Sequence, residues 1–285
     1  MPQKVALITG SGKQRIGWHV AHALGLIGYH LCIHYRTSAL EAKQSAELLN
    51  NAGIEATIFQ ADLALESDVE RMFHEIKAKF GRLDVLVNCA SIWERKDILE
   101  LSSNDVTRHF EANVLATFLP SRLAGLMMIA QSEGGNIITI GDWAQDRPYL
   151  GYSAYFATKG AIPTLTRSLA VELGSRNPKV RVNCILPGPV MLPLDLPLQE
   201  RQEAINATLV RSEGSPKDLL ICPCKNAKKL STPLSCVLKV PQKIFHERYY
   251  FLFKVNLLRE SNCLWMVVEP YGQMGDSLFH PEFSI

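Results

Sequence analysis

The amino-acid sequence predicts an α/β fold in which one parallel β-sheet lies between two layers of helices. Short apolar or β-branched segments alternate with longer segments of helical period, in a β-α-β-α order. The short segments are apolar throughout, which is typical of parallel strands buried on both faces. Residues of reactive or phosphate-binding character follow these segments, where open α/β sheets bind ligands. Together these observations predict a doubly wound, Rossmann-type parallel sheet in a three-layer α/β/α arrangement.

The predicted elements follow one another in order along the chain. Strands are predicted over residues 5–9, 30–34, 55–60, 85–88, 136–140 and 180–186. Amphipathic helices are predicted over residues 16–26, 39–52, 66–80, 103–130 and 155–173. The candidate functional residues lie just past five of the strands, after Ile8, His34, Asn88, Ile140 and Leu186.

The composition indicates an ordinary globular protein and argues against several other classes. The chain has 285 residues, a formal net charge of +2 and 47% hydrophobic residues, which fits one large α/β domain. A near-neutral charge provides no basic surface for nucleic acid or for an anionic membrane. No apolar run approaches the ~18 residues of a transmembrane helix, and residues 5–8 form too short a run for a signal peptide. We therefore expect a cytoplasmic protein.

The seven cysteines are expected to be reduced and to bind no metal. Cys32, Cys89 and Cys184 lie inside apolar runs, where a buried thiol is expected. Cys222 and Cys224 form a Cys-x-Cys pair, but no second pair or nearby histidine completes a zinc site.

A glycine-rich turn links the first strand to the first helix and is the first candidate for cofactor binding. Residues 9–17 read Thr-Gly-Ser-Gly-Lys-Gln-Arg-Ile-Gly. Glycines let the backbone turn tightly and approach a pyrophosphate, and the helix N-terminus offers free N–H groups. An ordinary loop is the alternative, but the position after the first strand favours a cofactor. The residues expected to bind it are Gly10, Lys13, Arg15, Ile16 and Gly17.

The end of the second strand favours NADPH over NADH. An NAD-selective site usually has Asp or Glu here to bind the ribose hydroxyls, whereas this chain has Arg36, Thr37 and Ser38. These groups suit a 2′-phosphate, because Arg binds phosphate through bidentate, charged hydrogen bonds. A solvated basic loop is the alternative. After the third strand, Asp62 and Leu63 are expected to cover the adenine, with a helix N-cap as the alternative role of Asp62.

Tyr155 and Lys159 are the candidate reacting groups, because a spacing of four residues places them on one face of a helix. A phenol with a pKa of about 10 is a poor acid at neutral pH. A neighbouring ammonium stabilises the phenolate, so we expect Lys159 to lower the pKa of Tyr155. Asp142, thirteen residues before Tyr155 and just past the fifth strand, strengthens the pattern.

These motifs resemble the successive landmarks of the short-chain dehydrogenase/reductase family. Between Val5 and about Asp218 the matching residues are Thr9-Gly10, Asn88-Cys89-Ala90-Ser91, Asn113, Tyr155-x-x-x-Lys159, Arg181-Val182-Asn183 and Pro187-Gly188. The resemblance implies that Tyr155 is the proton donor and that Lys159 also binds the nicotinamide ribose. It further implies that Asn113 supports a proton-relay water. The residues that it places along the cofactor are Asn88, Ala90, Pro187 and Gly188.

Two features resemble the pteridine-reductase branch of that family. Most members have Ser thirteen residues before the Tyr, where this chain has Asp142; an ionised carboxylate would repel a carbonyl oxygen but suits a protonated ring nitrogen or a proton relay to Tyr155. The segment Asn88-Cys-Ala-Ser91-Ile-Trp93 is similar to one in which an aromatic ring and the nicotinamide enclose a flat pteridine and the Ser contacts the cofactor. The resemblance implies that Trp93 stacks on the substrate. A lid residue that packs under a loop is the alternative.

The resemblance ends near Asp218, which divides the chain into a reductase domain of residues 1–218 and a divergent tail of residues 219–285. The family normally continues with a helix, a final strand and Val-Asp-Gly-Gly. The codons of Trp265 and Met266 and the first two bases of Val267, read in a displaced frame, give Asp-Gly, and the following bases permit Gly-Arg-Thr. We hypothesise that the tail arose from a frameshift or a retained intervening sequence. Such a tail would leave a sheet edge and part of a subunit interface uncovered.

The favoured function is NADPH-dependent hydride transfer to a C=N bond of a dihydropteridine or dihydrofolate-like ring, with Tyr155 and Asp142 delivering the proton. Trp143 and Arg147 are expected at the edge of the substrate pocket. One alternative is a carbonyl reductase that uses the same Tyr155 and Lys159. Another is a cofactor-binding pseudoenzyme inactivated by the altered tail. The expected partners are NADPH and a small-molecule substrate, and the resemblance implies a homotetramer.

Overall fold

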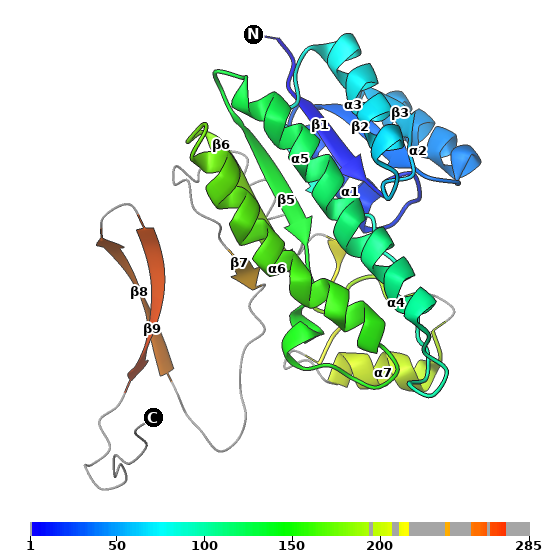
Figure 1. The fold of residues 1–285 in the computed structure, drawn as a ribbon, viewed down its shortest axis with the longest axis vertical. Helices are drawn as coiled ribbons and strands as arrows, with labels where there is room; N and C mark the ends of the chain where they lie inside the picture. The colour runs from blue at the N-terminus through cyan, green and yellow to red at the C-terminus, as the bar shows by residue number, and fades with distance from the viewer. Residues whose placement is uncertain are drawn as a thin grey trace, which may run out of the picture. The chain divides into compact units, whose positions relative to one another are not determined.

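The chain folds into two compact units, residues 1–242 and 243–285, in a computed structural model (Figure 1). The structure describes residues 2–193, 196–206 and 211–216. It also describes the backbone of β7 (Val237–Lys239), β8 (Leu252–Glu260) and β9 (Cys263–Tyr271). β8 and β9 pair antiparallel within the second unit. The units divide at Gln242, farther along the chain than Asp218, where the motif pattern ends. The reason is that β7 joins the sheet of the first unit.

The sheet of the first unit has seven strands in the order β3-β2-β1-β4-β5-β6-β7, and every neighbouring pair is parallel. Its six long members are β1 (Val5–Thr9), β2 (His30–Tyr35), β3 (Ala56–Gln60), β4 (Val85–Asn88), β5 (Gly135–Ile140) and β6 (Val180–Leu186). The direction of winding reverses between β1 and β4, and doubly wound sheets bind ligands at such a reversal. The predicted doubly wound α/β fold is confirmed.

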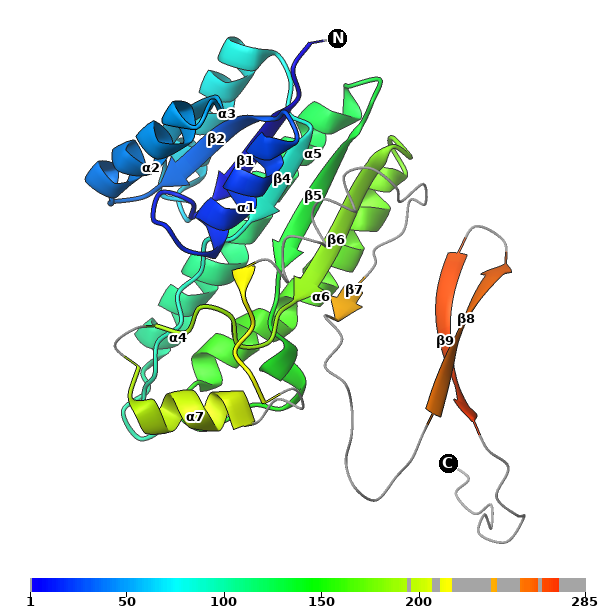
Figure 2. The same cartoon turned by 180° about the vertical axis from the view of Figure 1, so that it is seen from behind.

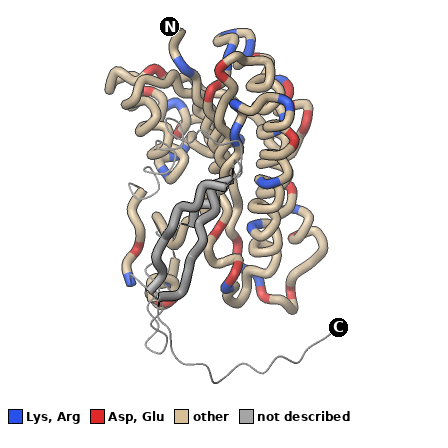
Figure 3. The backbone as a smooth tube through the Cα atoms, turned by 90° about the vertical axis from the view of Figure 1, so that its left-hand side faces the viewer, with Lys and Arg blue, Asp and Glu red and all other residues tan. Residues whose placement is uncertain are grey.

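Helices cover both faces of this sheet, as the two opposite views show (Figures 1 and 2). One face packs against α3 (Glu66–Phe80), α5 (Ala116–Ile129) and α6 (Ser153–Gly174), and the other against α1 (Ile16–Leu26) and α2 (Ala39–Asn51). Along β1, Val5 and Leu7 face the first group, whereas Ala6 and Ile8 face the second. Because successive strand residues point to opposite faces, a strand between two helix layers is apolar at every position. Lys and Arg are interspersed with Asp and Glu around these layers (Figure 3).

The predicted helix over residues 103–130 consists of three segments: α4 (Ser103–His109), the π-helical turn η1 (Phe110–Leu115) and α5. α4 begins with a capping box between Ser102 and Asp105. By length and composition, Ser103–Ile129 is apolar enough to cross a membrane, so the expectation that no segment approaches this size is wrong. Half of the most apolar stretch of this segment is buried, and α5 packs against α3, α6 and the sheet. These contacts are those of a core helix.

The outer edge of β6 is covered at its carboxyl end. Cys184, Ile185 and Leu186 pair with the three residues of β7. The sequence predicted that the divergent tail would leave this edge uncovered, and the structure differs over these three positions because a segment of the tail is extended beside β6.

Because Leu7 lies between the two helix layers, we expect its substitution to be among the most destabilising in the chain. Leu7 is 0% exposed at the centre of the sheet, whereas Leu40 on α2 is 66% exposed. Leu7→Ala is expected to lower the free energy of unfolding by about 2–5 kcal/mol, because it leaves a cavity that cannot collapse. The control Leu40→Ala is expected to change it by no more than about 0.5 kcal/mol. Urea denaturation followed by circular dichroism measures both, and equal losses would contradict the assigned core.

Candidate active site

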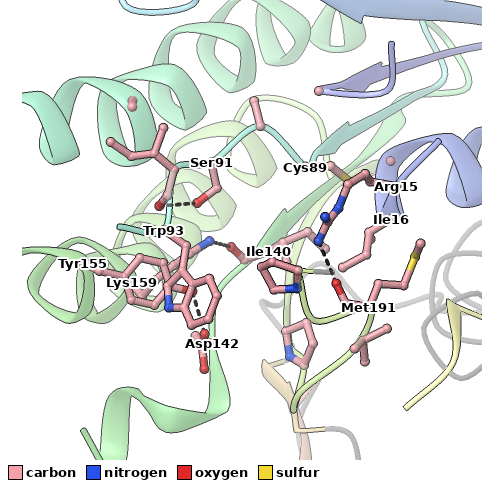
Figure 4. A pocket seen from close by; sticks show the side chains of 18 of the residues that line it. Arg15, Ile16, Cys89, Ser91, Trp93, Ile140, Asp142, Tyr155, Lys159 and Met191 are labelled. Carbon is pink, nitrogen blue, oxygen red and sulfur yellow. Dashed lines mark hydrogen bonds between the residues drawn. The ribbon is translucent and has the colours of Figure 1, made fainter. Parts of the chain in front are cut away.

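A cavity of about 930 Å³ lies at the carboxyl ends of the strands, within the range of roughly 300–1,000 Å³ that ligand pockets occupy. Segments far apart in the sequence line it, drawn from residues 10–17, 34–38, 62–64, 89–95, 112–116, 140–152, 155–159, 187–193 and 196–204. Figure 4 shows Asp142, Tyr155 and Lys159 on one side of the cavity, with Arg15 and Met191 on the other. The strand order therefore gathers most of the predicted site residues at one edge of the sheet.

The glycine-rich turn fits tightly against the end of β4. Gly10 has a φ of +64°, and a Cβ added there would lie 2.9 Å from Ala90 Cα. Thr9 Oγ1 accepts hydrogen bonds from the backbone N–H groups of Cys89 (3.0 Å) and Ala90 (3.1 Å). A Cβ at Gly17 would lie 2.8 Å from Gly10 O. Both glycines are required because the backbone segments approach more closely than a side chain permits.

Basic side chains surround this turn. Arg15 Nη2 donates to Met191 O at 2.6 Å across the cavity (Figure 4), and Met191 has the left-handed φ of 52°. Lys13 Nζ lies 3.5 Å from Glu41 Oε1, and both side chains are exposed. These guanidinium and ammonium groups give the open side of the turn a positive charge that suits a phosphate.

Arg36 and Asp62 follow β2 and β3, which lie on the other side of β1 from β5 and the reacting groups, and both residues line the cavity. Arg36 Nη1 is 3.9 Å from Asp62 Oδ2. Asp62 Oδ1 accepts a hydrogen bond from Ala64 N at 3.0 Å. The N-cap residue of α3 is Leu65, so Asp62 is not the helix cap, and its alternative role as an N-cap is wrong. Leu63 and Ser38 also line this end of the cavity.

Tyr155 and Asp142 form the centre of the reactive side. Tyr155 Oη donates to Asp142 Oδ2 at 2.6 Å, and Lys159 Nζ donates to Ile140 O at 3.0 Å (Figure 4). Asp142 Oδ1 accepts a hydrogen bond from Ala144 N at 2.8 Å, which fixes the carboxylate at the start of the 3₁₀ turn η2 (Trp143–Asp146). The carboxylate and the phenol are thus held in direct contact by β5 and α6.

Burial governs the charges of this centre, because Tyr155 and Lys159 are each only 6% exposed. Burial raises the pKa of Tyr155 well above its usual value, and the Asp142 carboxylate adds to the rise. Burial also raises the pKa of Asp142 and lowers the pKa of Lys159. The expected net lowering of the Tyr155 pKa is therefore not seen in this structure, because burial and the Asp142 carboxylate outweigh any effect of Lys159. Lys159 Nζ is 5.7 Å from the phenol ring centroid, whereas the carboxylate is in hydrogen-bonding contact.

Asn113 joins the segment after β4 to the helix that carries Tyr155. Its Oδ1 accepts hydrogen bonds from Ser91 Oγ (3.0 Å) and Ile92 N (2.7 Å). Its Nδ2 donates to Thr158 Oγ1 (2.9 Å), which in turn donates to Tyr155 O (2.6 Å). Asn113 is 2% exposed and does not line the cavity, which its neighbours in η1 and α5 do. Its role in a proton relay stays a prediction.

Residues 4–203 match the sequence pattern of the short chain dehydrogenase family. The chain belongs to the short chain dehydrogenase family. Among curated relatives, a short-chain type dehydrogenase/reductase of Picea abies is 33% identical over 195 residues, which cover 66% of this chain and 70% of the relative. A 3-oxoacyl-[acyl-carrier-protein] reductase of Mus musculus is 32% identical over 208 residues, 73% of this chain and 84% of the relative.

Solved structures of dehydrogenases share the fold. A dehydrogenase/reductase from Sinorhizobium meliloti superposes with a TM-score of 0.77 at 28% identity, covering 86% of this chain and 96% of that one. A putative dehydrogenase from Burkholderia cenocepacia, solved with bound NADP, gives a TM-score of 0.71 at 25% identity, covering 79% of this chain and 87% of that one. The chain is thus a member of an oxidoreductase family that uses nicotinamide cofactors.

Within this short chain dehydrogenase, Trp93 belongs to an aromatic cluster beside the reactive side, whose other members the sequence analysis missed. The Trp93 and Tyr152 rings are stacked, with centroids 5.0 Å apart and planes at 12°. Tyr149 meets Tyr152 and Phe156 edge to face. Trp93, Tyr149 and Tyr152 line the cavity, as do Trp143 and Arg147, which were expected there. Tyr152 is the N-cap residue of α6, three residues before Tyr155, and this spacing was the available signal.

Some of the predicted residues do not line the cavity. Asn88 is buried, and its Nδ2 donates to Ser121 Oγ at 2.9 Å behind the end of β4. Thr37 is exposed outside the lining. Ala90, Ser91, Pro187 and Gly188 all line it. Cys222 and Cys224 lie outside the described residues, and in the described part of the chain no group of three or more His, Cys, Asp or Glu side chains is placed to hold a metal ion.

The close contact at Gly10 predicts that an added methyl group costs more there than at another left-handed glycine. Gly28 has a φ of +92° and open space around its Cβ position. Gly28→Ala is expected to lose about 1–2 kcal/mol of unfolding free energy from backbone strain. Gly10→Ala is expected to lose a further ~1–3 kcal/mol, because Ala90 must move. Urea denaturation of the two variants measures the difference. Similar losses of unfolding free energy would mean that the backbone at Ala90 moves easily to make room for the added methyl group.

Proposed function

We propose that the chain is an NADPH-dependent reductase that transfers a hydride to a C=N bond of a flat dihydropteridine or dihydrofolate-like ring. The observation that carries the proposal is the hydrogen bond of 2.6 Å between Tyr155 Oη and Asp142 Oδ2. A carboxylate beside the phenol would repel the oxygen of a ketone, but it stabilises a ring nitrogen that gains a proton.

The proposed reaction needs one hydride and one proton. When bound, the cofactor would supply the hydride for the new C–H bond, and the π electrons of the C=N bond would move to the ring nitrogen. The ring nitrogen takes the proton from Tyr155, and Asp142 in turn holds the proton that restores the phenol. The raised pKa of Asp142 supports its part in this step, because burial favours the protonated carboxyl group that can restore the phenol. Trp93 is proposed to stack on the substrate ring.

The residues around the turn fit the cofactor in this proposal. Gly10 and Gly17 lack the Cβ atoms that would block close approach of a pyrophosphate. Arg36 and Ser38 at the far end of the cavity supply charge and a hydroxyl for a 2′-phosphate. Lys159 Nζ, now bonded to Ile140 O, is proposed to hold the nicotinamide ribose. Ser91 and the segment at Pro187 and Gly188 would border the nicotinamide half, and Asn113 would support a relay water.

Carbonyl reduction is the second candidate function. The mouse relative, named a 3-oxoacyl-[acyl-carrier-protein] reductase, supports it, and Tyr155 and Lys159 would serve a ketone in the same way. A cofactor-binding pseudoenzyme is the third, because the tail from residue 219 departs from the family pattern. NADPH oxidation with dihydrobiopterin, dihydrofolate and a panel of ketones separates the three. Pterin-selective turnover supports the first, ketone-only turnover the second, and NADPH binding without turnover the third.

We also propose that the enzyme acts in the cytoplasm and assembles as a homo-oligomer. The near-neutral charge of the chain supports the first point. The family resemblance, which implies a homotetramer, supports the second, and the exposed Leu126 on α5 and Val171 on α6 lie on helices of one face of the sheet, where a partner subunit could cover them.

Tyr155→Phe is expected to lower the turnover of dihydropteridine by roughly 10²–10⁴-fold, because the variant cannot deliver the proton. The affinity for NADPH should stay within about 2-fold. Tyr29→Phe is the matched control, since Tyr29 is buried but does not line the cavity, and it should keep its turnover. Stopped-flow kinetics with NADPH measures both variants; undiminished turnover in Tyr155→Phe would remove the phenol from the mechanism.

Arg36→Ala is expected to raise the KM for NADPH by about 10–100-fold and to leave the KM for NADH nearly unchanged. Only NADPH carries the 2′-phosphate, and a hydrogen bond to a charged group contributes about 1.5–3 kcal/mol. Arg122→Ala is the control, because Arg122 pairs with Glu66 at 3.1 Å away from the cavity. Steady-state kinetics with both cofactors measures the change. An equal loss for NADH would show that Arg36 does not select the phosphate.

A further inference from the structure

His34, at the carboxyl end of β2, connects three strand ends through its side chain and backbone. It is 2% exposed. Its Nδ1 accepts a hydrogen bond from Gly10 N at 3.0 Å, in the turn after β1. Its Nε2 lies 3.1 Å from Ala61 O, the residue that follows β3 and precedes Asp62. Because a carbonyl only accepts and a backbone N–H only donates, these partners require a neutral ring with its proton on Nε2.

The backbone of His34 holds the same turn. Ser11 N and Gly12 N both donate to His34 O at 3.1 Å. His34 N donates to Ser11 Oγ at 3.2 Å, and Ser11 Oγ donates to Ile8 O at 2.7 Å. Three successive amides of the glycine-rich turn are therefore bound to one residue. None of the three is free for a phosphate, so the turn has its shape before any ligand arrives.

The charge state of His34 agrees with these bonds. Burial lowers the pKa of His34 to about 4, against a smaller upward effect of its bond to Ala61 O and of the Asp62 carboxylate; the Arg36 guanidinium lowers it further. At neutral pH the ring is therefore uncharged, and Nδ1 keeps the lone pair that Gly10 N needs. The left-handed φ of Gly10 is thus held in place by an acceptor on the neighbouring strand.

We propose that His34 is a positioning residue for the dinucleotide, which fixes the glycine-rich turn relative to the strand end that carries Asp62 and Leu63. The inference rests on the proposed function, in which the pyrophosphate lies against the turn, and on the expectation from the sequence that Asp62 and Leu63 cover the adenine. The distance between those two halves of the site is then set by one imidazole that bridges Gly10 and Ala61. His34 acts through these two residues and contacts no reacting atom.

Three substitutions at His34 separate the two bonds. In His34→Asn, the amide oxygen can take the place of Nδ1 and accept from Gly10 N, but it cannot reach Ala61. In His34→Gln, the amide nitrogen can take the place of Nε2 and donate to Ala61 O, which leaves Gly10 N without an acceptor. His34→Phe keeps a ring of similar size and removes both bonds. His30→Asn is the matched control at the other end of β2, where both ring nitrogens also have partners, Glu55 and Thr57, away from the cavity.

Three quantities are measured for each full-length variant. They are the dissociation constant of NADPH, from cofactor fluorescence, the melting temperature, and kcat at saturating NADPH. We expect His34→Phe to weaken NADPH binding about 10-fold or more, and the Asn and Gln variants about 3–10-fold each, with kcat within 2-fold. His30→Asn should lower the melting temperature but keep the dissociation constant within 2-fold. If His34→Phe does not fold, the Asn and Gln variants carry the test.

Two results overturn the inference. One is NADPH binding within 2-fold of the unsubstituted protein in the His34 variants, and the other is an equal loss of affinity in His30→Asn, which would indicate general destabilisation. Failure of the proposed function looks different, because the unsubstituted protein itself would then bind no NADPH, and the inference would fall with it.

Discussion

The close approach of two strand ends, β1 and β4, is the constraint on which the site depends. The winding of the sheet reverses there, so the chain leaves the two strands toward opposite helix layers and opens a crevice. Thr9 Oγ1 fastens the two ends together through two backbone amides. A glycine must follow Thr9, because Ala90 occupies the space of any Cβ. The cavity opens beside this junction.

The reactive groups are buried, and each would lower the stability of the fold if it lacked a hydrogen-bond partner. A buried carboxylate, phenol or ammonium costs several kcal/mol without hydrogen bonds. Here Asp142 accepts from Tyr155 and from Ala144 N, and Lys159 donates to Ile140 O. Asn113 holds α6 against the segment after β4. These hydrogen bonds offset the cost of burying the groups. They also fix the separation of Tyr155 and Asp142, so the same bonds stabilise the fold and hold the site in place for proton transfer.

Much of this architecture could be predicted from the sequence, because buried parallel strands are continuous apolar runs; β1, β4 and β6 have the predicted bounds. Helical period cannot show the extra residue of a π-helical turn, so η1 was missed. The pKa of Tyr155 was predicted in the wrong direction, because the burial of the phenol and its contact with Asp142 depend on the three-dimensional structure. His34 and Tyr152 were overlooked for the same reason, since their partners Gly10, Ala61 and Trp93 are remote in sequence.

The bonding of the glycine-rich turn to its own framework has an evolutionary consequence. The backbone amides of Gly10, Ser11 and Gly12 all donate hydrogen bonds to His34. These backbone bonds set the shape of the turn, whereas side chains around it select the ligand. Exposed side chains such as Lys13 and Arg36 can then be exchanged in descendants without refolding the loop. Ligand preference can drift by single substitutions while the scaffold is inherited unchanged.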